Sequence, residues 1–167
     1  MKRLLLLRHA KSSWSDDGLA DYERPLAPRG RKAGKQLARW FAEHDVRPDL
    51  VVCSSAIRAQ QTLALVQAAL GDPPVSAEDG LYAASCATLL ARVRQLPGTA
   101  SSALFVGHNP GLADLCLLLS ASSERRDRVA ENLPTGALAV LELPIDAWPA
   151  IETGEARLVE LILPREL

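Results

Sequence analysis

The chain has 167 residues, of which 48% are hydrophobic, and its formal net charge is -1. This length and apolar content suit one globular domain over residues 1–167, with a core of its own. The even balance of charges argues against a basic nucleic-acid footprint or a polybasic membrane surface, so we expect a small-molecule or protein partner, with no nucleic acid and no membrane.

The first residues imitate the start of a secretory signal, but their apolar run stops at Arg8 and is too short for one. No other run approaches transmembrane length. Three widely spaced cysteines form neither a disulfide framework nor a metal-binding pair: Cys53, Cys86 and Cys116. We therefore predict a reducing, cytoplasmic setting.

Strand and helix patterns alternate along the chain. In chain order, the predicted elements are a strand at Leu4–Leu7, a helix at Pro28–His44, a strand at Leu50–Cys53, a helix from Ser55 to about Leu70, a short strand near Val75, a helix at Ser85–Leu96, a strand at Ala103–Val106, a helix at Leu112–Leu119, and strands at Ala137–Leu143 and Arg157–Leu163. Ser55 is expected to cap its helix and Gly71 to help end it. The stretch Ser122–Arg128 fits a solvated loop or a helix. The alternation predicts an α/β fold with a mostly parallel central sheet and helices on both faces.

Polar side chains follow three of these predicted strands. They are Arg8, His9 and Lys11 after the first strand, Ser54, Ser55 and Arg58 after the second, and His108 and Asn109 after Ala103–Val106. In an open α/β sheet, ligands bind in the crevice beyond the carboxyl ends of the strands. We therefore expect these residues to converge in space.

Two arginines and two histidines at one end of a sheet suit a phosphate dianion. Arginine is always charged, and its planar fork of donors matches phosphate oxygens. Arg58 is expected in the first turn of its helix, where free N–H groups favour the same anion. A neutral imidazole can attack phosphorus in line, and water can then hydrolyse the phosphohistidine, which divides one difficult step into two. We predict His9 as the nucleophile and His108 as a donor to the transferring phosphoryl group.

Several of these side chains also have a purely structural interpretation. Lys11 either adds positive potential at the pocket mouth or is a solvated loop residue. Arg24 and Arg29 either contact substrate or pair with Asp21 or its neighbour Glu23. The residues predicted to bind substrate are Arg8, Arg58, His108, Asn109, Lys11, Asp21 and Ser55.

A set of motifs lies in a fixed order along the chain. They are Arg8-His9-Ala10, the loop Asp21–Leu26, the stretch Ser54–Thr62 around Arg58, Leu81–Ser85, Gly107-His108-Asn109 and Pro134–Ala137. In these motifs the chain resembles the histidine phosphatase superfamily, in its SixA-like phosphohistidine phosphatase branch. The resemblance implies a three-layer α/β/α sandwich, a phosphate pocket built by two arginines and two histidines, and no metal or cofactor. Ala10 stands where the larger superfamily usually has glycine, which fits the SixA-like branch and requires a backbone that avoids positive φ.

The proton donor to the leaving group is the least determined residue. In larger superfamily members an acidic residue does this, on a segment that would correspond to Glu78–Tyr82. We predict Asp79 as the acid, with Asp21 and Glu78 as alternatives. A phosphohistidine substrate relaxes the demand, because its leaving imidazole takes up a proton near neutral pH.

The spacing of the predicted elements bears on the substrate. The interval between Val75 and Ala103 has room for little more than one helix, so no large insertion covers the site. An open pocket suits a phosphorylated protein side chain better than a metabolite that must be shielded from water. We predict a phosphatase acting on phosphohistidine in partner proteins. The alternatives are a phosphatase for small phosphate esters with the same mechanism, a mutase, and a non-catalytic phosphate-binding module.

Overall fold

A six-stranded sheet forms the centre of the computed structural model, which describes residues 1–167. Its strands are β1 (Lys2–Arg8), β2 (Leu50–Ser54), β3 (Val75–Glu78), β4 (Ser102–Gly107), β5 (Leu138–Leu143) and β6 (Arg157–Ile162). They lie in the order β3-β2-β4-β1-β5-β6. The first four run parallel, whereas β5 is antiparallel to both β1 and β6. The predicted mostly parallel sheet is therefore confirmed.

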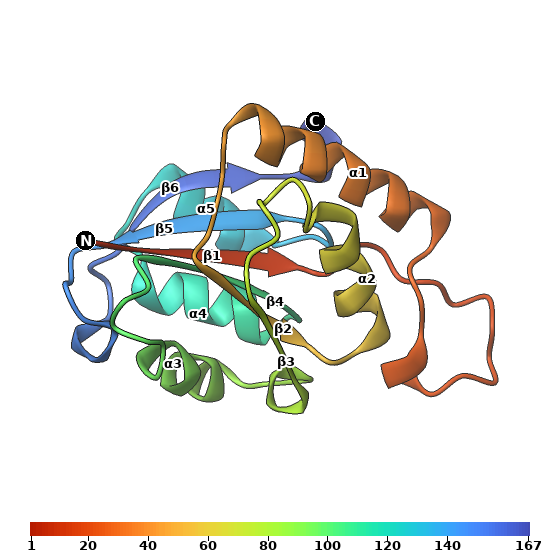
Figure 1. The fold of residues 1–167 in the computed structure, drawn as a ribbon, viewed down its shortest axis with the longest axis horizontal. Helices are drawn as coiled ribbons and strands as arrows, with labels where there is room; N and C mark the ends of the chain where they lie inside the picture. Colours follow the sequence, from red (N-terminus) through yellow and green to blue (C-terminus); the bar gives the residue numbers. More distant parts are fainter.

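Five α-helices cover this sheet. They are α1 (Pro28–Glu43), α2 (Ile57–Val66), α3 (Cys86–Arg94), α4 (Gly111–Leu119) and α5 (Glu124–Glu131). Helices α1 and α2 pack on one face, and α3, α4 and α5 pack on the other, which gives the three layers of an α/β/α sandwich (Figure 1). None of these helices has the length and apolar character that a membrane crossing requires.

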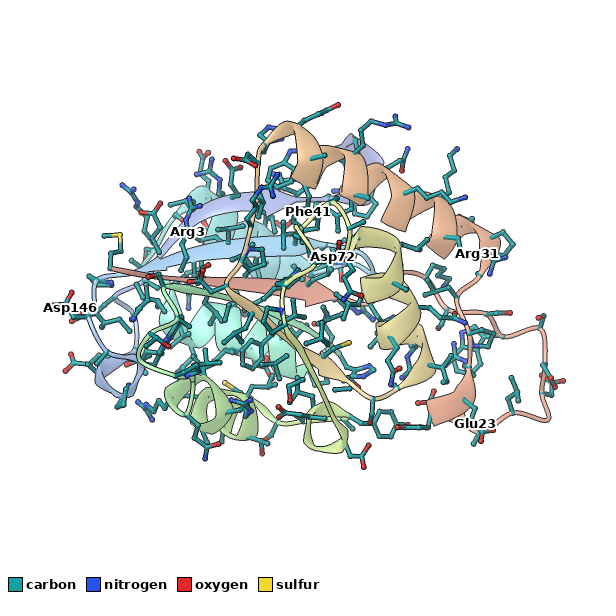
Figure 2. All side chains as sticks on the ribbon, in the orientation of Figure 1. Arg3, Glu23, Arg31, Phe41, Asp72 and Asp146 are labelled. Atoms are coloured by element: carbon teal, nitrogen blue, oxygen red, sulfur yellow. The ribbon has the colours of Figure 1, made fainter.

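The sheet has a hydrophobic core on each face because successive side chains of a strand point to opposite sides. In β1, Leu4 and Leu6 belong to the core beneath α3, α4 and α5, whereas Leu5 and Leu7 belong to the core beneath α1 and α2. Phe41 projects from α1 into the second core (Figure 2). A central strand buried on both sides explains the uninterrupted apolar run of the sequence.

The predicted helix cap at Ser55 is wrong. Helix α2 begins at Ile57 and has Ala56, without a capping side chain, at its N-cap. The side chain of Ser54 instead satisfies a backbone donor at this end of the helix, since its Oγ accepts a hydrogen bond from the N–H of Ala56 at 3.2 Å. The N–H of Ser55 is bonded to the carbonyl of Glu78 at 3.2 Å, which keeps this residue beside the end of β3.

Two other local predictions have clear outcomes. Helix α2 ends at Val66, earlier than the predicted Leu70, and a turn continues to Gly71, whose φ of 84° lies in the left-handed region that glycine adopts readily. Of the two interpretations of Ser122–Arg128, the helix is correct. Ser123 caps α5 by accepting a hydrogen bond from the N–H of Arg126.

The start of α1 fixes the segment that follows β1. A Cβ atom added at Gly30 would lie 2.1 Å from the carbonyl oxygen of Lys11. We expect Gly30→Ala to lower the free energy of unfolding by about 2 kcal/mol, because the backbone beside the site must shift. Urea denaturation measures the change. Gly98→Ala is the control, since its Cβ would meet no atom within 4 Å. Equal losses in the two variants would contradict the steric explanation.

Candidate active site

Two histidines follow neighbouring strands at the centre of the sheet. Strands β1 and β4 pair in register, with Arg8 opposite Gly107, and the N–H of His9 donates to the carbonyl of Gly107 at 3.0 Å. The rings of His9 and His108 come within 5.1 Å of each other, centroid to centroid. The segment after β1 passes beyond the arrowhead of that strand in Figure 1, so the site lies at the carboxyl edge of the sheet.

Hydrogen bonds define the tautomer of His9. Its Nδ1 lies 2.7 Å from the carbonyl oxygen of Ala10, which can only accept, so Nδ1 carries the proton. The other nitrogen, Nε2, accepts a hydrogen bond from Nε of Arg58 at 3.3 Å. Nε2 therefore carries no proton, and its electron pair lies beside a guanidinium that can also bind the oxygens of a phosphate group.

The backbone around Ala10 holds this arrangement in place. Ala10 is buried and does not adopt positive φ, as its methyl group requires. Its N–H donates to Oγ1 of Thr62 at 2.9 Å, and that hydroxyl donates to the carbonyl of Arg58 at 2.7 Å. The segment that carries His9 and the arginine that contacts its ring are thus joined through one residue of α2.

Burial keeps His9 neutral. It lowers the pKa of the imidazole to about 3, with further lowering by His108, Arg58 and Arg8, although the bond to Ala10 acts in the opposite direction. The pKa of His108 falls to about 4, again mainly through burial and then through Arg58. Both rings are therefore unprotonated near neutral pH.

Ser54 orients His108. The Oγ of this fully buried serine lies 2.8 Å from Nε2 of His108 and already accepts from the N–H of Ala56. Its hydroxyl proton has one remaining partner, Nε2 of His108, so Nδ1 of that ring carries the imidazole proton. His108 is therefore a neutral hydrogen-bond donor.

The two predicted arginines both border the pocket. Arg58 lies in the first turn of α2 and Arg8 at the end of β1. Arg8 donates through Nη1 to the carbonyl of Leu133 at 3.0 Å, but its buried Nε has no partner. Burial and the nearby Arg58 both lower the pKa of Arg8. An anion between the two guanidinium groups would relieve this repulsion.

Asp21 is the only carboxylate on the pocket wall. It accepts from Arg24 at 2.8 Å, from Arg58 at 3.0 Å and from the hydroxyl of Tyr82 at 2.6 Å. These bonds lower its pKa to about 2, and the bond from Tyr82 has the largest effect. Asp21 is therefore ionised at any pH where the enzyme would work, and it orients Arg58.

The other two candidate acids lie outside the pocket wall. Asp79 accepts from Oγ of Ser55 at 2.5 Å, and the turn at Asp79–Leu81 directs it there. Glu78 forms two hydrogen bonds with Arg92, which lower its pKa. The expectations that Asp79 protonates the leaving group and that Ser55 contacts substrate do not fit this geometry.

The pocket has a volume of about 370 Å³ and a strongly positive wall. The lining residues are Arg8, His9, Lys11, Ser12, Trp14, Asp21, Arg24, Arg58, Tyr82, Ala83, His108, Asn109 and Thr135. Asn109 lines it, although its side chain bonds the carbonyl of Leu133 and the N–H of Ala113. Four cations face one carboxylate, so a dianion balances most of the charge. No group of three His, Cys, Asp or Glu side chains is placed to hold a metal ion.

Sequence reasoning did not assign several of these contacts. Tyr82 and Thr62 belong to the sequence motifs named above, but their partners become clear only in the fold. The hydroxyl of Tyr82 bonds Asp21, and that of Thr62 accepts from the N–H of Ala10. Trp14 was not identified from sequence, and its exposed indole lies against the guanidinium of Arg24, 3.1 Å from ring centroid to Cζ. A neutral imidazole in a cationic pocket at the carboxyl edge of an α/β sheet is typical of enzymes that transfer phosphoryl groups.

Comparison with known proteins agrees with this class. Residues 4–87 match the family model of the histidine phosphatase superfamily (branch 1), and the chain belongs to that family. An uncharacterized protein of Mycobacterium tuberculosis is 35% identical over 163 residues, which cover 95% of this chain and all of the relative. The structure assigned as phosphohistidine phosphatase SixA from Nakamurella multipartitia is 32% identical, with a TM-score of 0.84 over 98% of this chain and 96% of the other.

The same fold also occurs in phosphatases of small molecules. The structure assigned as an α-ribazole-5'-P phosphatase from Escherichia coli has a TM-score of 0.67 and 21% identity, over 98% of both chains. Family membership therefore supports phosphatase activity, and the choice of substrate depends on the site itself.

The lowered histidine pKa values predict a distinct titration. His9 and His108 should both remain neutral when the free enzyme is brought from pH 7 to pH 5, and should take up protons only near the values of about 3 and about 4. Since the unfolded chain binds these protons at higher pH, stability should fall as the pH drops below about 6.5. NMR of the ring resonances, assigned with His9→Ala and His108→Ala, measures the titration of each ring. Urea denaturation at a series of pH values measures the stability. A midpoint near 6.5 for either ring would contradict the account.

Proposed function

We propose that this phosphatase hydrolyses phosphohistidine on partner proteins. Nε2 of His9 attacks the phosphorus, the P–N bond to the substrate imidazole breaks, and that imidazole leaves with a proton from solvent. Water then attacks phospho-His9, which releases phosphate and regenerates the neutral ring. Arg8, Arg58 and the Nδ1–H of His108 stabilise the phosphoryl oxygens in both steps.

The nature of the only pocket carboxylate supports this substrate most directly. An alkoxide leaving group needs an acid that is protonated at working pH, but Asp21 is held as an anion with a pKa of about 2. A histidine leaving group takes its proton near neutral pH without such an acid. The charge state of Asp21 thus favours a phosphoramidate over a phosphate ester of an alcohol.

The open surroundings of the pocket support a protein substrate. The connection from β3 to β4 contains the short turn Asp79–Leu81 and the nine-residue helix α3, with no insertion over the site. Trp14 at the pocket rim is 69% exposed. A side chain presented on a protein surface can therefore enter directly.

We also propose a cytoplasmic location, since the three cysteines are free thiols.

A substrate panel tests the proposal. We expect kcat/KM for a phosphohistidine peptide to exceed that for sugar phosphates by about a hundredfold or more, since the site has no acid for an alkoxide. His9→Ala should lower turnover by about a thousandfold or more and should prevent trapping of an acid-labile phosphoryl group on the protein. His44→Ala, which removes an exposed ring from the end of α1, is the control. Equal activity on both substrate classes would reject the phosphohistidine assignment.

The role of Asp21 can be tested separately. If this carboxylate orients Arg58, Asp21→Asn should lower kcat/KM by about tenfold for a phosphohistidine peptide and by a similar factor for p-nitrophenyl phosphate, whose leaving group needs no proton. A proton donor would show a different pattern, with the loss confined to substrates that have poor leaving groups. That second pattern would overturn the assignment of Asp21 as a positioning residue.

A further inference from the structure

A second cleft adjoins the active-site pocket. It has a volume of about 470 Å³ and lies between the first turns of α1, the Pro134–Thr135 segment and the C-terminal turn Pro164–Glu166. Lys11 and Thr135 line both the pocket and this cleft, so the two lie next to each other. The C-terminus lies beside α1 in Figure 1, so two segments far apart in the sequence border the cleft together.

The cleft is basic and its cations are unpaired. Lys11, Arg29, Lys32 and Arg165 line it, all are exposed, and none forms an ion pair or a side-chain hydrogen bond. No acidic side chain lines the cleft. Some exposed arginines elsewhere are neutralised by acidic neighbours, namely Arg47, Arg128 and Arg157. Arg39 and Arg125 are also exposed and unpaired, but neither lines a cleft shared with other cations.

The positive charge of the cleft does not stabilise helix α1. Helix α1 has no acidic residue in its first turn and places Arg29 and Lys32 near its N-terminus, where the helix dipole disfavours cations. The chain as a whole has a net charge of -1. Positive charge is therefore concentrated on the surface that leads to His9, where it can attract a negatively charged partner.

We propose that this basic cleft binds an acidic segment of the phosphorylated partner protein, with Asp or Glu side chains that flank the phosphohistidine. This inference rests on the proposed function, since the phosphoryl group occupies the adjoining pocket. The cations come from separate elements, α1 and the C-terminal turn, and each extends from an exposed position. Such a spread suits several carboxylates along a polypeptide better than one compact phosphate, which needs converging donors.

Two peptides and two charge-reversal variants test the cleft. One peptide carries phosphohistidine between Asp and Glu residues, and the other has Asn and Gln in their place. Wild type should favour the acidic peptide by about tenfold in kcat/KM, and added salt should reduce this preference. The variant Arg29→Glu/Lys32→Glu/Arg165→Glu should abolish the preference and leave hydrolysis of the free phosphohistidine amino acid unchanged.

A matched control separates the cleft from net charge. Lys35→Glu/Arg39→Glu/Arg125→Glu changes the same number of exposed, unpaired cations, which line neither the pocket nor the cleft. This variant should keep the preference for the acidic peptide. If it loses as much as the cleft variant, or if wild type hydrolyses both peptides equally, the inference is overturned while the proposed function stands.

A binding measurement keeps the two proposals distinguishable. If no phosphohistidine substrate is hydrolysed, the proposed function fails. Fluorescence anisotropy with the unphosphorylated acidic peptide then decides on the cleft. Binding by wild type and by the control variant, but not by the cleft variant, would support it, and equal binding by all three or by none would overturn it.

Discussion

The site depends on the hydrogen bond from Nδ1 of His9 to the carbonyl oxygen of Ala10. Burial disfavours the imidazolium, so the ring has one N–H to place, and the carbonyl takes it. With the proton on Nδ1, the electron pair of Nε2 is free and Arg58 can donate to it. The opposite tautomer would place two N–H groups against each other and leave a buried carbonyl without its partner.

The rest of the fold maintains that bond. Pairing of β1 with β4 places His9 beside His108, and Thr62 links the N–H of Ala10 to the first turns of α2. The cationic residues that suit a phosphate also repel one another, as the lowered pKa of Arg8 beside Arg58 indicates. Asp21 offsets part of this repulsion by binding Arg24 and Arg58. The same carboxylate is consequently unsuited to donate a proton, which connects the electrostatics of the pocket to the proposed substrate.

Local sequence signals predicted the elements well, because apolar runs and helical spacing are short-range properties. The run Leu4–Leu7 indicates a strand buried on both faces, and a histidine after such a strand indicates the carboxyl edge. Contacts between distant segments were not predictable in this way. The cap expected at Ser55 is absent because the N–H of this residue is bonded to Glu78 at the end of β3. That pairing also places the Ser55 hydroxyl beside Asp79, whose carboxylate accepts from it. The antiparallel direction of β5 likewise follows from packing across the whole sheet.

The position of the phosphoryl group on the trapped enzyme tests the central claim most directly. Protein labelled with ¹⁵N on histidine, reacted with a phosphohistidine peptide and quenched in base, can be examined for coupling between ³¹P and the ring nitrogens of His9. The hydrogen bond to Ala10 predicts coupling to Nε2 alone, with Nδ1 still protonated. A phosphoryl group on Nδ1, or on any residue other than His9, would contradict the account.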